Sequence, residues 1–190
     1  MTLLDGYPLP NLRLFTGKLA GAKIFSRIDL VKAYHQIPLD LESQKKTTVV
    51  TMWGAWQFRR LAMGLRNAGQ SFQRLMDHVL GDIPDIFIYM DDVLIFSRDE
   101  KSHLATIEEV LKRLADNGLA ISLKKCAFGE RELEFVGYKI NSQGITPLER
   151  KLTAIASFPA PKKQKHLLGF LGAINYYRRS LPRLEGQSAA

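Results

Sequence analysis

Two adjacent carboxylates, Asp91 and Asp92, interrupt the apolar run IFIYMDDVLIF at residues 86–96. Ile, Phe, Tyr and Val favour strands, and apolar runs this short are typical of buried strands. Two charges inside such a run are costly if they are buried without a partner, so they must reach water at a turn or bind a cation. The run therefore predicts a hairpin with the two carboxylates at its tip. They either hold a divalent metal ion there or mark a turn that aspartate favours.

A third carboxylate, Asp29, lies near the end of a second strand-like segment, IFSRIDL at residues 24–30. In two-metal phosphoryl transfer, acidic residues on neighbouring strands hold two cations about 4 Å apart. The cations activate the attacking oxygen and stabilise the leaving oxygen. An aspartate at a strand end and an aspartate pair on an adjacent hairpin match this arrangement, so the three residues together indicate a two-metal site.

Periodicity, caps and turn residues predict the elements that would position these carboxylates. Besides the segments above, we expect a strand pair within residues 47–58 turning near Gly54, a helix over 67–80 ended by Gly81, a helix between a cap at Ser97 or Asp99 and a stop at Asn117, strands over 119–123 and 134–140, and short helices over 148–158 and 164–177. In the second helix, Leu104, Ile107, Leu111 and Leu114 would form the buried stripe. The order of elements predicts an α+β fold, an antiparallel sheet with helices on one face.

Composition and charge restrict the class of protein further. The 190 residues are 46% hydrophobic and 24% charged, which is ordinary for a globular protein and excludes disorder. No apolar run approaches the roughly 20 residues needed to cross a bilayer, so we expect no membrane partner. The single cysteine, Cys126, can form neither an internal disulfide nor a zinc ribbon. The net charge is +8, and residues 150–190 hold eight Lys or Arg against one acidic residue. This basic segment favours a polyanionic partner such as nucleic acid, with a solvated basic surface as the alternative.

Five strings in order carry a family resemblance: FSRIDLVKAYHQIPL, GLRNAGQSFQRLMDHVL, YMDD, KKCAF and EFVGYKI. Together they resemble the reverse transcriptases of LTR retroelements, closest to gypsy-type retrotransposons, and the similarity runs from Asp5 to about Arg183. The resemblance implies a polymerase palm with an antiparallel sheet, partial fingers and the beginning of a helical thumb. Residues 1–143 would be the palm with partial fingers, of which 40–66 are fingers-like, and residues 144–190 the start of the thumb.

The resemblance also implies an activity and roles for residues. A primer 3′ hydroxyl would attack the α-phosphate of a dNTP on an RNA or DNA template. The catalytic metal ligands would be Asp29, Asp91 and Asp92 with the backbone carbonyl of Leu30, for two Mg²⁺ ions or alternatively Mn²⁺. The nucleotide-binding residues would be Tyr34, which excludes a 2′ hydroxyl, Met63, Gly64, Met90 and Lys125. The primer- and template-binding residues would be Arg66, Asn67, Gln73, Tyr89, Phe135, Val136, Gly137 and Tyr138. For Tyr34, Phe135 and Val136, plain core packing is the alternative.

Departures from the family's pattern leave other functions open. Ala62-Met63 stand where Pro-Phe is common, and Gly69 stands where a proline is usual. The resemblance further implies that the first fingers strands, ribonuclease H and integrase of a Pol polyprotein lie outside this chain. A non-catalytic nucleic-acid-binding remnant or a domesticated retroelement protein is therefore the alternative to a polymerase, and an unrelated two-metal nuclease is a more remote one.

Overall fold

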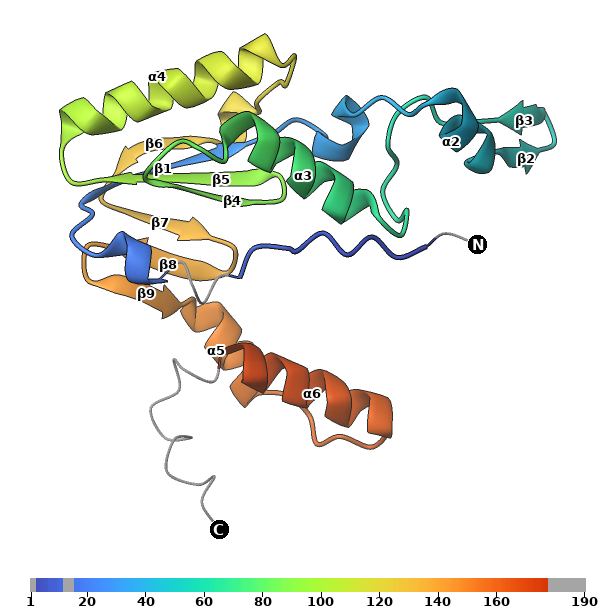
Figure 1. Ribbon diagram of the computed structural model, residues 1–190. Helices are drawn as coiled ribbons and strands as arrows, with labels where there is room; N and C mark the ends of the chain where they lie inside the picture. Colours follow the sequence, from blue (N-terminus) through green and yellow to red (C-terminus); the bar gives the residue numbers. More distant parts are fainter. Residues whose placement is uncertain (1–2, 12–15, 178–190) are drawn as a thin grey trace.

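A four-stranded antiparallel sheet with the strand order β4-β5-β1-β6 forms the centre of the molecule (Figure 1). The computed structural model describes residues 3–11 and 16–177. The strands of this sheet are β1 (Ile24–Asp29), β4 (Ile86–Tyr89), β5 (Asp92–Ser97) and β6 (Ala127–Glu130). The predicted hairpin is confirmed, because β4 and β5 pair directly and only Met90 and Asp91 lie between them.

Two helices, α3 (Ala68–Leu80) and α4 (Glu100–Asp116), cover one face of this sheet (Figure 1). Strand residues such as Ile28, Val93 and Ile95 are fully buried against Phe72 and Met76 of α3 and against the apolar face of α4. Burying each such side chain contributes about 1.5–3 kcal/mol, so this layer supplies much of the folding free energy. The predicted α+β palm architecture with helices on one face of an antiparallel sheet is confirmed.

A second, three-stranded sheet packs on the opposite face of the central sheet. Its strands are β7 (Glu132–Phe135), β8 (Tyr138–Asn141) and β9 (Gly144–Pro147), in that order. Phe25 of β1 and Leu94 of β5 form a second core cluster with Leu133, Phe135 and Ile140 of this sheet. The division expected between residues 143 and 144 falls inside the β8–β9 hairpin, so the helical C-terminal part starts only with α5 (Glu149–Ala156).

Some predicted elements are wrong in detail. Residues 119–123 do not form a strand; Ile121 makes an isolated bridge to Leu30, and the 3₁₀ helix η3 (Leu123–Lys125) follows. The single strand predicted over 134–140 is two strands, because Val136 and Gly137 have φ of 46° and 83° and turn the chain back. Gly81 does end α3, but in a right-handed conformation and not as a left-handed cap.

Three of the four residues predicted for the buried stripe of α4 contact the core, since Leu114 is buried and Ile107 and Leu111 pack against the core cluster. The fourth, Leu104, does not. Leu104 is 66% exposed, and His103 is buried in its place. His103 Nε2 lies 2.7 Å from Ser26 Oγ of β1, and its Nδ1 lies 3.1 Å from Ser97 Oγ of β5. Asp99 is the N-cap, and its side chain accepts the Ser102 N–H. The sequence pattern failed here because a histidine with two hydroxyl partners replaces a leucine at the helix–sheet interface.

The arm around residues 41–56 and the two C-terminal helices lie away from the central sheet (Figure 1). The helix α2 (Leu41–Lys46) and the strands β2 (Val49–Thr51) and β3 (Gly54–Trp56) form an arm, which contains the strand pair predicted near Gly54. Helix α5 is followed by α6 (Gln164–Tyr177), and both predicted C-terminal helices are therefore present. Short 3₁₀ helices, η1 (Thr16–Leu19) and η2 (Ala33–Gln36), flank β1. Within residues 3–11 and 16–177, no helix has the length and apolarity that a bilayer span requires.

Candidate active site

The alternation of β1 and β5 brings Asp29 and Asp92 to the same face of the central sheet. The two residues are direct cross-strand partners, so they lie within one strand spacing of each other. Residues Ser26 and Ile28 of β1 point toward α3 and α4, and Asp29, one residue further on, must therefore point to the opposite face. Asp92 precedes the helix-facing Val93 and lies on that same opposite face. The two carboxylates are thus kept out of the helix-covered core.

The turn Met90-Asp91 carries the third carboxylate. Met90 has a φ of 53°, a left-handed conformation that costs a non-glycine residue about 1–2 kcal/mol. Two hydrogen bonds hold the turn: the Met90 N–H donates to Gln73 Oε1 of α3 at 2.8 Å, and the Leu30 N–H donates to the Asp91 backbone oxygen at 3.3 Å. The second bond ties the turn to the residue that follows Asp29, so Asp91 lies beside the other two acidic residues.

The electrostatics of Asp92 reflect this crowding of negative charge. The pKa of Asp92 is raised to about 6. Burial is the largest cause, and the neighbouring charges of Asp91 and Asp29 add to it. The charges of Arg27 and Lys125 partly oppose the rise. Like charges that lie close enough to shift a pKa are stabilised when a cation binds between them.

The donor set of this cluster fits a hard divalent cation. In this structure, no group of three or more Asp, Glu, His or Cys side chains among the described residues is placed so that it could hold a metal ion. However, the buried Oδ1 of Asp29 has no hydrogen-bond partner in the described part of the chain, and its nearest cation is Lys125 Nζ at 3.5 Å. Carboxylate oxygens are the ligands that Mg²⁺ prefers, and Mg²⁺ completes its shell with water and substrate phosphates. Asp29, Asp91 and Asp92 therefore suit such an ion when a phosphate substrate supplies further ligands.

Arg27 is a component of this site that the sequence interpretation missed. Its guanidinium donates to the backbone oxygens of Glu134 in β7 and Lys125 in η3, at 2.9 Å each. Because Arg27 lies two residues before Asp29 in the same strand, the period of two already places it on the face of the carboxylates. The strand period therefore predicts the face on which Arg27 lies, whereas its contacts with β7 and η3, 107 and 98 residues away, become visible only in the structure.

Among the predicted nucleotide-binding residues, Tyr34, Met90 and Lys125 lie at the carboxylate cluster. The Tyr34 ring packs on Phe72 at 5.5 Å, and its hydroxyl donates to Met90 Sδ at 3.7 Å. Burial raises the pKa of Tyr34, with a further contribution from Asp91. Met63 is 75% exposed and Gly64 has a φ of 85°, and both precede α3.

The predicted primer- and template-binding residues divide into two groups. The β7–β8 turn contains Val136 and Gly137, and Tyr138 follows as the first residue of β8. Tyr89 of β4 packs with Val136 against the same core cluster. Two of these side chains are buried, because Gln73 and Phe135 are each 1% exposed, and for Phe135 this agrees with the alternative of core packing.

Asn67 and Arg66 stand at the start of α3. Both polar atoms of the Asn67 amide bind the N-terminal segment: Nδ2 donates to the Leu3 backbone oxygen at 2.8 Å, and Oδ1 accepts the Asp5 N–H at 3.2 Å. In this structure Asn67 therefore serves an intramolecular contact. Arg66, just before it, is exposed.

The fold and sequence of this chain place it among the reverse transcriptases. The family described as reverse transcriptase (RNA-dependent DNA polymerase) matches residues 2–140, and the chain belongs to this family. Reverse transcriptases of this family use divalent metal ions.

The relatives are Pol polyproteins of gypsy-type LTR retrotransposons. The chain is 40% identical over 184 residues to the retrovirus-related Pol polyprotein from transposon 297, and 37% identical over 179 residues to that from transposon gypsy, both of Drosophila melanogaster. These matches cover 96% and 93% of this chain but 17% of each polyprotein, so the chain spans about a sixth of their length.

Solved structures of foamy viral protease-reverse transcriptase share the fold. The complex of the dRH form with double-stranded DNA has a TM-score of 0.84 at 28% identity, and covers 93% of this chain and 31% of that one. The complex with an RNA/DNA hybrid has a TM-score of 0.80 at 28% identity, covering 93% of this chain and 24% of that one. The resemblance read from the five sequence strings is thereby confirmed.

Proposed function

We propose that this chain is the core of an RNA-directed DNA polymerase, which transfers nucleotides from dNTPs to a primer 3′ hydroxyl on an RNA or DNA template. The observation that carries the proposal is the pairing of Asp29 with Asp92 across β1 and β5, beside the Asp91 turn. Three acidic residues close together destabilise the fold through the repulsion of their charges, and folding alone gives no reason to bring them together. A metal-dependent reaction on a polyphosphate gives them a purpose.

Asp29, Asp91, Asp92 and the backbone carbonyl of Leu30 would hold two Mg²⁺ ions, with Mn²⁺ as the alternative. When bound, the ions would increase the acidity of the primer hydroxyl and neutralise charge on the phosphates. The chain's own residues would supply positioning: Tyr34 would lie under the nucleotide sugar, and Lys125 would attract the triphosphate. Positioning and charge stabilisation account for most of the catalysis in such transfers.

The primer would run over the β7–β8 turn, and the template over the start of α3. Val136 and Gly137 form that turn with φ of 46° and 83°, and the Tyr176 hydroxyl of α6 donates to the Val136 backbone oxygen at 3.4 Å. The arm around residues 40–66 would be the fingers-like part, and α5 and α6 the start of the thumb. Basic residues of the C-terminal part, including Lys162, Lys163 and Lys165, would attract the nucleic acid; Arg178, Arg179 and Arg183 lie outside the described residues.

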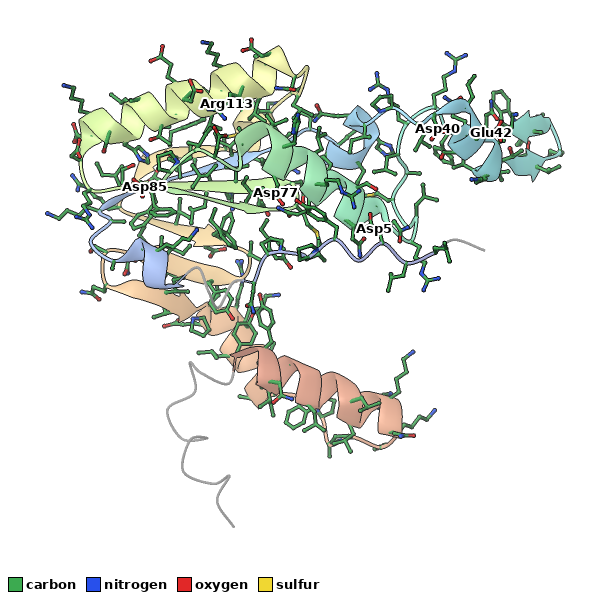
Figure 2. The ribbon with its side chains drawn as sticks, viewed as in Figure 1. Asp5, Asp40, Glu42, Asp77, Asp85 and Arg113 are labelled. Atoms are coloured by element: carbon green, nitrogen blue, oxygen red, sulfur yellow. The ribbon has the colours of Figure 1, made fainter. Side chains whose placement is uncertain are left out.

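Primer extension on a homopolymer RNA template with Mg²⁺ tests this function. Asp91→Asn should abolish extension, because a metal ligand is lost, and should leave primer–template binding largely intact. Asp85→Asn is a matched control, since Asp85 is exposed at the other end of the same hairpin and its φ of 58° suits asparagine (Figure 2). Equal extension by Asp91→Asn and wild type would exclude the metal role. No extension by wild type, with binding that weakens as salt rises, would favour a nucleic-acid-binding remnant instead.

A further inference from the structure

A chain of hydrogen bonds connects the N-terminal strap, residues 3–11, to the Met90-Asp91 turn through α3. In Figure 1 the strap runs alongside α3, and Figure 2 labels Asp5 on the strap and Asp77 on the helix. The Tyr7 hydroxyl donates to Asp77 Oδ2 at 2.8 Å, and Gln73 Nε2 donates to Asp77 Oδ1 at 2.9 Å. Gln73 Oε1 then accepts the Met90 N–H at 2.8 Å.

Asp77 determines which way the buried Gln73 amide points. A carboxylate can only accept hydrogen bonds, so the amide nitrogen of Gln73 must face Asp77 and the amide oxygen must face Met90. With the amide reversed, two donors would meet at Met90 and two acceptors at Asp77. Because Gln73 is 1% exposed, water cannot repair such a mismatch, and the penalty keeps the amide in one orientation.

The strap holds the outer end of this chain. The Arg74 guanidinium lies 4.7 Å from the centroid of the Tyr7 ring and donates to both carboxylate oxygens of Asp5, at 2.8 and 2.7 Å. The Tyr7 N–H donates to Asp5 Oδ1 at 3.0 Å. These contacts fix the Tyr7 hydroxyl opposite Asp77, although Tyr7 is 70 residues away in the sequence.

We propose that Tyr7 and Asp77 are positioning residues, which act through Gln73 to hold the Met90-Asp91 turn in its left-handed conformation. The Met90 N–H bond helps to offset the backbone strain at φ 53°, so a misoriented Gln73 would free the turn to relax. Asp91 would then move relative to Asp29 and Asp92. The structural inference stands on the contacts alone, and its consequence for catalysis rests on the proposed function.

Amide hydrogen exchange at Met90, measured by NMR on the 190-residue chain, is the deciding experiment. Asp77→Ala should accelerate exchange of the Met90 N–H about tenfold or more, while the Phe87 and Val93 amides of the flanking strands keep their rates. Asp77→Asn should restore protection, because its amide oxygen can still accept from Gln73. Glu108→Ala, an exposed change on α4, is the matched control and should leave Met90 unchanged.

Tyr7→Phe provides a milder test that does not alter the helix. It removes only the outer hydrogen bond and should accelerate Met90 exchange about threefold, a value below the effect of Asp77→Ala. The inference is overturned if Met90 exchange is unchanged in both variants, or if it rises only in step with Phe87 and Val93, which would mean general destabilisation. Should Asp77→Ala not fold, the result with Tyr7→Phe decides.

Single-nucleotide extension separates this inference from the proposed function. If wild type extends primers, Asp77→Ala should lower kcat about tenfold with an unchanged KM for primer–template, and Asp77→Asn should recover most of it. An unchanged kcat despite faster Met90 exchange would refute the positioning role. If wild type does not extend primers at all, the proposed function fails, and the exchange result alone supports or overturns the connection from the strap to the turn.

Discussion

Ser26→Ala should destabilise the fold without disturbing the carboxylates. Ser26 Oγ accepts the Gly129 N–H at 2.9 Å and lies 2.7 Å from His103 Nε2. Gly129 is exposed, so water can replace the serine at its N–H. His103 is only 2% exposed, and its Nε2 would be left without a partner, at a cost of about 1–3 kcal/mol. This is a substantial part of the roughly 5–15 kcal/mol by which such domains are stable.

Urea unfolding at pH 8, followed by circular dichroism, measures this change in the free energy of unfolding. The matched control is Ser142→Ala in the β8–β9 turn, where the side chain is exposed and the expected change is within about 0.5 kcal/mol. Because Ser26 points toward α4 and Asp29 toward the opposite face, primer–template binding below the melting transition should match wild type. A Ser26→Ala protein as stable as the Ser142→Ala control would refute the assignment of a buried Ser26–His103–Ser97 network.

Three further outcomes follow from the site and the core. Burial lowers the pKa of His103, so just below pH 6.5 only the unfolded state binds a proton at this histidine. The stability of the fold should therefore decrease as the pH drops from 6.5 toward 5. In thermal melting, His103→Gln should lose that part of the pH dependence. The pKa of Asp92 is raised from 3.8 to about 6, so its charge destabilises the metal-free fold as pH rises through 6. After discounting for solvent screening, Asp92→Asn in EDTA should be about 1–2 kcal/mol more stable than wild type at pH 8 and no more stable near pH 4. An equal or lower stability of Asp92→Asn at pH 8 would contradict this. Tyr34→Ala should admit ribonucleotides in primer extension. Unchanged discrimination between ribose and deoxyribose would refute the role of Tyr34 in excluding the 2′ hydroxyl.

Three strands of the central sheet, β1, β4 and β5, and their carboxylates could be predicted because their signals are local. A strand has a period of two residues, and that period places Asp29 and Asp92 on a face once β1 and β5 are recognised. The tip of the β4–β5 hairpin was equally readable, since two charges inside an apolar run must lie at a turn. Local signals also identified the strand pair near Gly54 and both C-terminal helices.

The parts that could not be predicted depend on contacts between distant residues. Gln73 is 17 residues from Met90, and nothing in the helix pattern distinguishes a glutamine that contacts nucleic acid from one turned into the core. Asn67 likewise bonds residues more than 60 positions away in the strap. The strand β6 was missed because its burial is slight and Gly129 has a φ of 69°, so neither alternation nor composition marks it.

The alternation within β1 has a consequence for how this segment tolerates mutation. Insertion or deletion of one residue between Phe25 and Ile28 would exchange the two faces of β1 beyond that point, moving Asp29 toward the helices and Ile28 toward the carboxylate site. Stability and chemistry would be lost in one event, whereas length changes in the arm at residues 52–53 would alter neither side of the sheet. Among natural copies of this element, gaps should therefore be absent from β1 and tolerated at the arm's tip.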